Sequence, residues 1–578
     1  MTRTVDAIAK LVADGLAAAQ ASGQLPPAGD MEISVEQPPE PSMGDFSTSL
    51  PLKLARPMKM APIEIGKRIA AAVAPSHLVS KVTVAAPGFI NFTLSDAWLR
   101  DQVASIRAAG LHYGETDAGK GEKVQLEFVS VNPTGPLHVG HARGAVIGSG
   151  MANVLQAAGY DVQREYYVND AGNQMKVFYD TLYARFMQAT DKEFPLPDPA
   201  YPGEYLTALG AQMHATHGRA LVGKPKEQVL KALAPEALRA TLANIRKDLE
   251  DLGVRYDLWF SERSLIDTNQ FVEAVALLES RGYVADREGA KWFVSTLLGE
   301  EKDNVIIRSG EGGPTYFGTD IAYHYNKFIK RGFSRVINVW GADHHGHVSR
   351  MKAVVKALGV EPTRLTIVLN QLVSFKQGEE TVKFSKRKGN IITVRELIDE
   401  VGPDACRFIF LSRSPDAQME FDLDLAKKQS SDNPVFYVQY AHARLCSVLR
   451  MAAERKVTFA DGDVSLLTHP REMELIRKLT ELPENVFRSA TRLEPHHLPY
   501  YAMELAKSLQ RFYEECQVIP REIDNLPLTK ARLLLVDASR VTLSRALAIM
   551  GMTAPERMDR APADADTAPG TQATQAPK

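Results

Sequence analysis

The stretch from residue 123 to residue 168 constrains the fold of this chain more than any other. Strand-like and helix-like patterns follow each other there, with a proline- and glycine-rich turn at 132–136 after the first strand. The strand patterns cover 123–129 and 161–168, and helical patterns cover 138–158 and 171–187. Such a succession is typical of a doubly wound parallel sheet, which binds its ligands beyond the carboxyl ends of the strands.

The first helical pattern opens with His138-Val139-Gly140-His141. A helix N-terminus presents unpaired N–H groups and the positive end of the helix dipole, so it suits the phosphates of a nucleotide. Gly140 leaves room for a base or a ribose, and the two imidazoles can donate to phosphoryl oxygens from the same side of the first turn. We expect an ATP site here. The alternative is that both histidines only cap the helix or fill the core.

A second motif, a basic loop at 383–390, follows much later in the chain. Four of its cations stand within six residues, next to Ser385 and Gly389: Lys383, Lys386, Arg387 and Lys388. Like charges repel unless an anion neutralises them, so phosphate of ATP or of RNA is the expected partner. A solvated basic loop is the alternative. The distance between the two motifs along the chain predicts a large insertion between two halves of one nucleotide-binding domain.

Composition bounds the classes of function. The 68 Lys and Arg residues against 70 Asp and Glu residues give a net charge of −2, so any nucleic-acid surface is a local patch. The three cysteines, Cys406, Cys446 and Cys516, form no CxxC pair, which favours the reducing cytoplasm and disfavours a Cys-rich zinc site. The chain has no uncharged apolar run of about 18 residues, so we expect no membrane span.

We expect five regions along the 578 residues. They are an α+β module at 1–115, a nucleotide-binding catalytic domain at 116–375 with an insertion at about 188–300, a basic-loop region at 376–425, a helical domain at 426–558 and a disordered tail at 559–578. In the first module, 46–74 reads as helical and 89–94 as a strand. The tail lacks every large apolar side chain, so it cannot bury a core.

Five blocks of the chain together resemble the arginyl-tRNA synthetases, a family of class I aminoacyl-tRNA synthetases. The blocks lie at 127–141, 316–320, 341–347, 383–390 and 432–444. The resemblance covers about residues 1–558, and 433–444 is its most specific part. It implies a multidomain α/β protein: a Rossmann-type HxGH catalytic domain with an insertion, an α+β N-terminal domain that contacts the D-arm side of tRNA, and an all-α anticodon-binding C-terminal domain.

The resemblance also implies an activity. Arginine would be ligated to tRNA-Arg through an arginyl-adenylate, with release of AMP and pyrophosphate, and its activation would require tRNA. ATP is then a substrate, Mg²⁺ accompanies it, and we expect no other metal. We further expect a cytoplasmic monomer with no membrane partner.

Residue roles follow from the same resemblance. The residues implied in ATP binding are His138, Gly140, His141, Lys383, Ser385 and Lys386, and those implied in catalysis are His138, His141, Lys383 and Lys386. Glu127, Asn132, Tyr316 and Asp320 would bind arginine, and Tyr440 and Arg444 would contact tRNA. A carboxylate pair suits the planar fork of a guanidinium. Phe384 and Arg387 depart from the family's usual Met and Ser in the basic loop.

Three other interpretations remain open at this point. An HxGH nucleotidyltransferase that makes a nucleotide-linked cofactor would share the ATP turn, but the helical C-terminal half would then be unexplained. A non-catalytic tRNA-binding relative would keep the N-terminal and helical domains, although the intact cations of the basic loop disfavour it. The His-rich segment 343–347 resembles a zinc cluster, yet it lacks a further ligand at standard spacing, so we expect no metal there.

Overall fold

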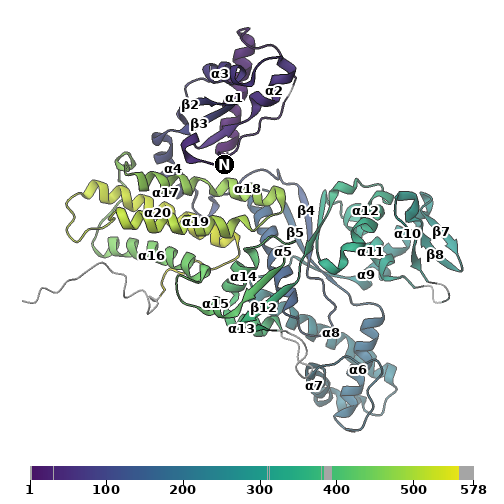
Figure 1. Cartoon of the computed structure of the whole chain (residues 1–578). Helices are drawn as coiled ribbons and strands as arrows, with labels where there is room; N and C mark the ends of the chain where they lie inside the picture. The colour runs from purple at the N-terminus through teal and green to yellow at the C-terminus, as the bar shows by residue number, and fades with distance from the viewer. Residues whose placement is uncertain are drawn as a thin grey trace, which may run out of the picture.

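The computed structural model describes residues 3–558, apart from 30, 309, 311, 312, 379 and 383–392. Figure 1 shows a central sheet with a helical bundle on one side, two smaller lobes on the other sides, and an N-terminal domain that projects from the bundle. The basic loop and the C-terminal tail lie outside the described residues. A membrane-crossing helix would have to be longer and more apolar than any that the described residues form.

The N-terminal domain is a three-stranded antiparallel sheet with helices. Its elements are α1 (Thr4–Ala21), β1 (Phe46–Thr48), α2 (Leu50–Met58), α3 (Pro62–Ala72), β2 (Val79–Ala85), β3 (Phe89–Leu94) and α4 (Asp96–Ala109), with sheet order β1-β3-β2. The helix expected over 46–74 is therefore wrong in part. Residues 46–48 pair with β3, and the helical remainder breaks where Lys59 adopts the left-handed conformation ahead of Pro62.

The central domain is built on a five-stranded, wholly parallel sheet. Its strands are β4 (Lys123–Phe128), β5 (Asp161–Val168), β6 (Leu258–Ser261), β10 (Arg335–Gly341) and β11 (Leu365–Asn370), in the order β11-β10-β4-β5-β6. Helix α5 (Gly140–Ala157) follows the central strand β4. A Cβ on Gly148 would come within 2.2 Å of the Phe128 ring, so the glycine lets this helix lie close against the sheet.

Two excursions interrupt the sheet. Between β5 and β6 lie α6 (Asn173–Gln188), α7 (Glu204–Leu221) and α8 (Lys226–Asp251). Between β6 and β10 lie α9 (Glu262–Asp267), α10 (Gln270–Ser280), the small sheet β7 (Val284–Arg287), β8 (Ala290–Phe293) and β9 (Asn304–Ile307), and α11 (Tyr316–Tyr325). The single insertion expected at about 188–300 is thus divided by a strand of the main sheet. Strand β6 has only four residues, too few to give a recognisable pattern.

The chain then crosses from the sheet to the bundle. The connecting elements are α12 (Val348–Ala357), β12 (Val373–Gln377), β13 (Glu380–Val382), α13 (Val394–Val401), α14 (Pro403–Leu411), β14 (Met419–Asp422) and α15 (Leu423–Lys427). The bundle consists of α16 (Pro434–Glu454), α17 (Pro470–Thr480), α18 (Leu482–Arg492), α19 (His497–Glu515) and α20 (Leu526–Ile549). One cluster of buried apolar side chains runs through the N-terminal domain, the sheet and the bundle, whereas α6, α7 and α8 have a core of their own.

A fully buried arginine ties three of these parts together. Arg407 on α14 donates to the carbonyl of Met550 at 2.8 Å, to those of Leu252 and Gly253 at 3.2 Å, and to Ser149 Oγ at 3.1 Å. Burial lowers the pKa of this guanidinium to about 10, so it stays charged at neutral pH. The buried charge is thus stabilised by backbone carbonyls after α8 and after α20, and by a side-chain hydroxyl on α5.

We expect Arg407→Met to destabilise the protein. The change leaves several buried carbonyls without a donor, at a cost of about 3 kcal/mol. Differential scanning fluorimetry should show a fall in Tm of about 2–3 °C for a chain of this length. Arg413→Met is the matched control, because Arg413 is exposed on the next segment, and it should shift Tm by no more than about 1 °C. If the two variants had the same Tm, Arg407 would not hold the three parts of the structure together as inferred.

Candidate active site

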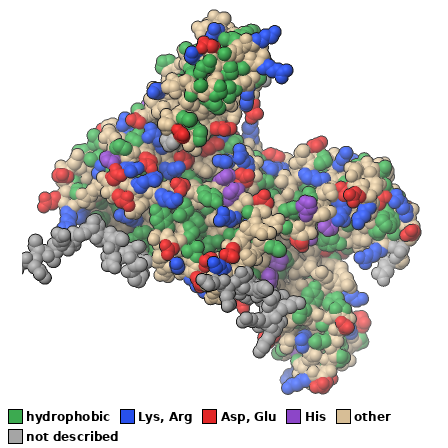
Figure 2. Space-filling model, viewed as in Figure 1, with side chains coloured by type: hydrophobic (Ala, Val, Ile, Leu, Met, Phe, Trp, Pro, Cys, Tyr) green, Lys and Arg blue, Asp and Glu red, His purple; other side chains and the backbone are tan. Residues whose placement is uncertain are grey.

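The HxGH turn lies at the carboxyl end of the central strand. His138 Nδ1 accepts a hydrogen bond from the Gly140 N–H at 3.0 Å, and the His138 and His141 rings are 6.3 Å apart and nearly perpendicular. A Cβ on Gly140 would contact only the His138 ring, so the other side of the turn is open. Figure 2 shows several separate histidine side chains on this face, most of them over its central part.

Both histidines of this turn are held neutral. Burial lowers the pKa of His138. Burial, and secondarily the neighbouring His138, lower the pKa of His141 to about 4, against a small opposing effect of Asp343. At neutral pH each ring therefore offers one N–H and one lone pair instead of a positive charge.

The segment that leaves the basic loop contacts the HxGH turn directly. Thr393 forms an antiparallel bridge with His138, and the Val394 N–H donates to the Leu137 carbonyl at 2.9 Å. Thr393 also caps α13 through a reciprocal pair of bonds with Glu396, which fixes the direction of the chain. The described residues next to the basic loop therefore lie beside the first motif.

The backbone between β4 and the turn is strained. Val129 and Ser130 have φ of 69° and 47°, values in the left-handed region that a β-branched residue rarely adopts. Ser130 Oγ accepts from the Tyr167 N–H at 3.0 Å, which helps to hold this conformation. A little further on, Asn132 donates from its side chain to Gln174 on α6. Strain of this kind is concentrated at functional sites.

Three carboxylates gather near the carboxyl edge of the sheet. Glu127 is the last residue but one of β4, Asp320 lies on α11 and Glu262 opens α9, and the two glutamates are each only 7% exposed. Burial, followed by the negative charges of Glu127 and Glu262, raises the pKa of Asp320 well above its usual value. Burial also raises the pKa of Glu262, and the same three carboxylates raise that of the nearby Tyr167 beyond the effect of burial. Such a cluster is suited to bind a cation.

Helix α11 presents two predicted residues to this cluster. Thr315 caps the helix by accepting from the Gly318 N–H at 3.0 Å, so Tyr316 and Asp320 fall one turn apart on one face. Tyr316 is 59% exposed and its pKa is raised, first by the Asp320 charge and then by burial. It lies at the mouth of the cluster and not at its base.

One buried cation already contacts the cluster. Lys327, in the π-helical turn η4 (Asn326–Lys330), is fully buried and donates to Glu127 Oε2 at 2.6 Å and to Asn338 Oδ1 at 3.0 Å. Neither Lys327 nor Glu262 was expected from the sequence. Glu262 follows a parallel strand directly, a position that would have indicated it had β6 been recognised.

The predicted tRNA residues lie far from the turn, on the bundle. Tyr440 and Arg444 belong to α16 and line a shallow groove with Tyr437, Gln510 and Tyr513. Arg444 donates to Gln510 Oε1 at 3.0 Å and lies 4.4 Å from the centre of the Tyr513 ring, and Tyr440 stacks on Phe436. The groove thus combines partly buried aromatic side chains with one cation.

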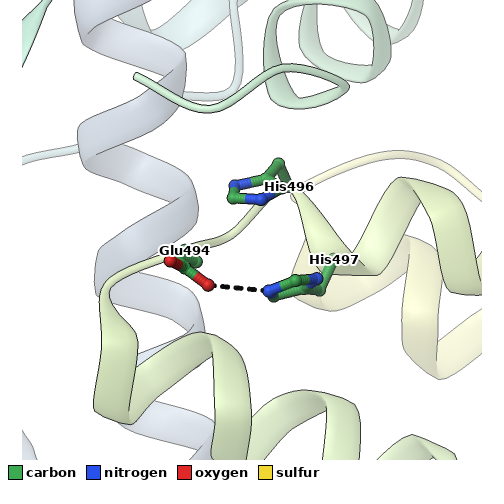
Figure 3. Close-up of side chains that lie close together, drawn as sticks. All are labelled: Glu494, His496 and His497. Carbon is green, nitrogen blue, oxygen red and sulfur yellow. Dashed lines mark hydrogen bonds and ion pairs between the residues drawn. The ribbon is translucent and has the colours of Figure 1, made fainter. Parts of the chain in front are cut away.

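A separate group of potential metal ligands begins α19. Among the described residues, Glu494, His496 and His497 are the three His, Cys, Asp or Glu side chains with ligand atoms within 4.8 Å of one another. Figure 3 shows that Glu494 bonds to His497, at 2.8 Å, while the His496 ring takes no part in that bond. Glu494 and His497 thus satisfy each other's hydrogen-bonding groups at the start of α19. The His-rich segment 342–347 instead forms a short 3₁₀ helix, η5 (Ala342–His347), that faces the HxGH turn.

The structure thus places Asn132, His138, Gly140 and His141 on the segment that follows β4, and it brings Glu127, Asp320 and Tyr316 together. Tyr440 and Arg444 are remote from them. The predictions for Lys383, Ser385 and Lys386, and the variants Phe384 and Arg387, lie outside the described residues.

Comparison with known proteins extends over nearly the whole chain. The family model for tRNA synthetases class I (R), catalytic domain, matches residues 102–413, and those for the arginyl tRNA synthetase N terminal domain and the DALR anticodon binding domain match 6–94 and 438–558. An arginine--tRNA ligase of Dehalococcoides mccartyi (strain CBDB1) is 52% identical over 93% of this chain and 96% of its own length. That of Heliobacterium modesticaldum is 48% identical over 93% and 95%. Thermus thermophilus arginyl-tRNA synthetase shares the fold, with a TM-score of 0.71 at 21% identity over 96% of this chain and 100% of its own.

An HxGH turn at the end of a central parallel strand, within a domain of this type, defines a class I aminoacyl-tRNA synthetase. Within that class, the chain belongs to the arginine--tRNA ligase family. The enzyme uses ATP to charge tRNA-Arg with arginine. The predicted fold class and family are confirmed, and charging is favoured over the nucleotidyltransferase and the non-catalytic relative.

We expect His141 to titrate far below the usual pH for histidine, about 6.5. In the enzyme with ¹³C-labelled histidine, the NMR resonance that His141→Asn removes should have its midpoint near pH 4. His138→Asn should raise that midpoint, because it removes a nearby positive charge. The unfolded chain takes up this proton first as pH falls, so the group should reduce stability progressively below about pH 6.5. A midpoint near 6.5 would contradict the neutral turn.

Proposed function

We propose that the HxGH turn and the carboxylate cluster together form the site where arginine is activated. The carboxylate of arginine attacks the α-phosphate of ATP in line, and pyrophosphate leaves. His138 and His141 donate N–H groups to phosphoryl oxygens as charge develops there, and the open side of Gly140 receives the adenosine. The observation that carries this proposal is that an ATP-type helix start follows β4 at the carboxyl end of the sheet, where Glu127 of the same strand belongs to a cluster of carboxylates.

The carboxylates supply the specificity for arginine. A guanidinium presents N–H donors in a rigid plane, and Asp320 and Glu127 offer acceptors that are costly to leave unpaired. We add Glu262 to this set, because it is buried and its charge acts on Asp320. Asn132, on the strained segment after β4, holds the amino-acid end of the substrate, and Tyr316 closes the mouth of the pocket.

The basic loop is proposed to bind the leaving group. We propose that Lys383 and Lys386, with Ser385, bind the β- and γ-phosphates and stabilise the pyrophosphate. The proposal is supported by the bridge between Thr393 and His138, because Thr393 is the first described residue after the basic loop and lies at the HxGH turn. Mg²⁺ supplies charge neutralisation on the phosphates when bound. Asp343 is the carboxylate whose charge reaches His141, so it would hold the ion together with phosphate oxygens and water.

The remaining domains address the tRNA. We propose that the groove with Tyr440 and Arg444 stacks unpaired anticodon bases, which aromatic faces and a guanidinium suit. The N-terminal domain then meets the D-arm side, and the connecting region at 376–425 meets the acceptor stem. All of the proposed arginine and ATP ligands come from one chain, in line with a monomer. Its three buried free thiols suit the cytoplasm.

The first test is isotope exchange between pyrophosphate and ATP. We expect exchange with arginine only when tRNA-Arg is present, because the family resemblance implies activation that depends on tRNA. Each amino acid is assayed with tRNA-Arg, without it, and with a non-cognate tRNA. Exchange with arginine alone would contradict the requirement for tRNA, and exchange with another amino acid would contradict the assigned pocket.

The second test concerns the charge of the pocket. Arginine binds ionised Asp320, whose folded-state pKa is raised, so the KM for arginine should fall as pH rises and then level off. Asp320→Asn should raise that KM about 100-fold and flatten its pH dependence, while the KM for ATP changes no more than about twofold.

Asp286→Asn is the matched control for this change. Asp286 is an exposed carboxylate on β7, in the same excursion as Asp320, and pairs with Lys291 at 3.3 Å. We expect kinetics like those of the parent enzyme. If Asp320→Asn raised both KM values equally, the assignment of Asp320 to arginine would be wrong.

A further inference from the structure

We infer that Lys327 is a positioning residue for arginine recognition: it holds Glu127 as an oriented carboxylate and couples it to Asp320. The inference rests on the proposed role of the carboxylates in binding arginine. It assigns a function to a lysine that touches neither substrate. The geometry that supports it is a continuous hydrogen-bonded path between the two carboxylate residues.

The path begins at Glu127. Lys327 Nζ donates to Glu127 Oε2 at 2.6 Å and to Asn338 Oδ1 at 3.0 Å. The amide nitrogen of Asn338 lies 3.1 Å from His324 Nε2, and His324 Nδ1 lies 2.8 Å from the carbonyl oxygen of Asp320. The bond to a carbonyl requires the proton on Nδ1, so Nε2 accepts from Asn338. Every donor in the path therefore has a matching acceptor.

Burial makes this path selective for one protonation state. Burial, and secondarily the Lys327 charge, lower the pKa of His324 to about 3, so the ring is neutral and its tautomer is fixed. The ammonium is fully buried, 4.0 Å from the centre of the Tyr323 ring, and Glu127 is its acidic partner. Without that ammonium, three carboxylates would share one buried space with no cation.

A neighbouring pair shows what a merely structural bridge looks like in this fold. Glu165, the register partner of Glu127 on β5, is bound through both oxygens by Arg331 and also accepts from the Tyr323 hydroxyl at 2.5 Å. Among the described residues, Glu127 accepts a hydrogen bond through Oε2 only. A lysine ammonium is a point charge and not a bidentate fork, so it binds one carboxylate oxygen and leaves Oε1 for a substrate N–H.

The experiment measures tRNA-dependent exchange from pH 6 to 9 for Lys327→Met, Lys327→Arg, Glu127→Gln and the double variant Lys327→Met/Glu127→Gln. We expect Lys327→Met to raise the KM for arginine about 10- to 100-fold, with the KM for ATP within about twofold. The pH at which the arginine KM levels off should move upward, because an unpaired buried carboxylate holds its proton more tightly. Lys327→Arg should restore most of both properties.

The double variant tests whether the two residues act as a unit. It leaves no unpaired buried charge, so it remains informative if Lys327→Met alone fails to fold. We expect its arginine KM to be no higher than that of Glu127→Gln. Lys330→Met is the control, since Lys330 lies in the same turn but pairs with Glu273 at the surface, at 2.7 Å. It should change neither KM by more than about twofold.

The failures are distinguishable. If Glu127→Gln and Asp320→Asn leave the arginine KM unchanged, the proposed arginine site itself is wrong. If those variants raise it while folded Lys327→Met does not, or if the double variant exceeds Glu127→Gln severalfold, the role of Lys327 is wrong and the arginine site stands.

Discussion

Two glutamates stand side by side on adjacent central strands, and the catalytic domain depends on how their charges are compensated. Glu127 on β4 and Glu165 on β5 are register partners, and both are buried. One helical segment supplies the positive charge for both glutamates. Lys327 and Arg331 are four residues apart on it, and each forms an ion pair with one glutamate. An uncompensated carboxylate at either position would cost several kcal/mol. The approach of α11 and η4 to the sheet is therefore fixed by electrostatics as well as by packing.

The start of α5 is also bound to residues that are distant from it in the chain. Arg143, one turn after the HxGH motif, donates to the carbonyls of Gln371 at 3.0 Å and Ser414 at 2.9 Å. These two residues flank the connecting region that contains the basic loop. Together with the bridge between Thr393 and His138, they bind that region to the start of α5. The start of α5 thus contacts described residues that precede and follow the basic loop in the chain.

Much of this arrangement could be predicted from the sequence, for identifiable reasons. The strands and helices at 123–187 are long enough for their periods to be read, and the HxGH turn is local in sequence. Glu127, Asp320 and Tyr316 came from family resemblance, because a carboxylate at a strand end or helix start looks like any surface residue. Lys327 could not be found in this way: a lysine in a helical pattern predicts solvent exposure, and only the tertiary fold buries it.

Glu262 was missed because of its strand. Its carboxylate acts on the cluster because β6 delivers it to the same edge of the sheet as Glu127, yet four residues carry no usable periodicity. Because β6 was not recognised, residues on both sides of it were assigned to one insertion at about 188–300. An error in a short strand thus became an error in the site, since in a parallel sheet the residue after each strand is a candidate ligand contact.

Burial keeps the histidines of the HxGH turn neutral, and this neutrality has a consequence for the charges of the proposed site. A concentration of negative charge suits the guanidinium end of arginine but repels the phosphates of ATP, which must bind close by for the reaction. Charged imidazolium rings at the HxGH turn would be drawn to the carboxylates of the site. Neutral rings instead donate hydrogen bonds without strong attraction to either side. In the proposed mechanism, the positive charge for the phosphates comes from Lys383, Lys386 and Mg²⁺ instead of from the histidines. A neutral turn would then let the proposed site bind a cationic side chain and a polyanion together.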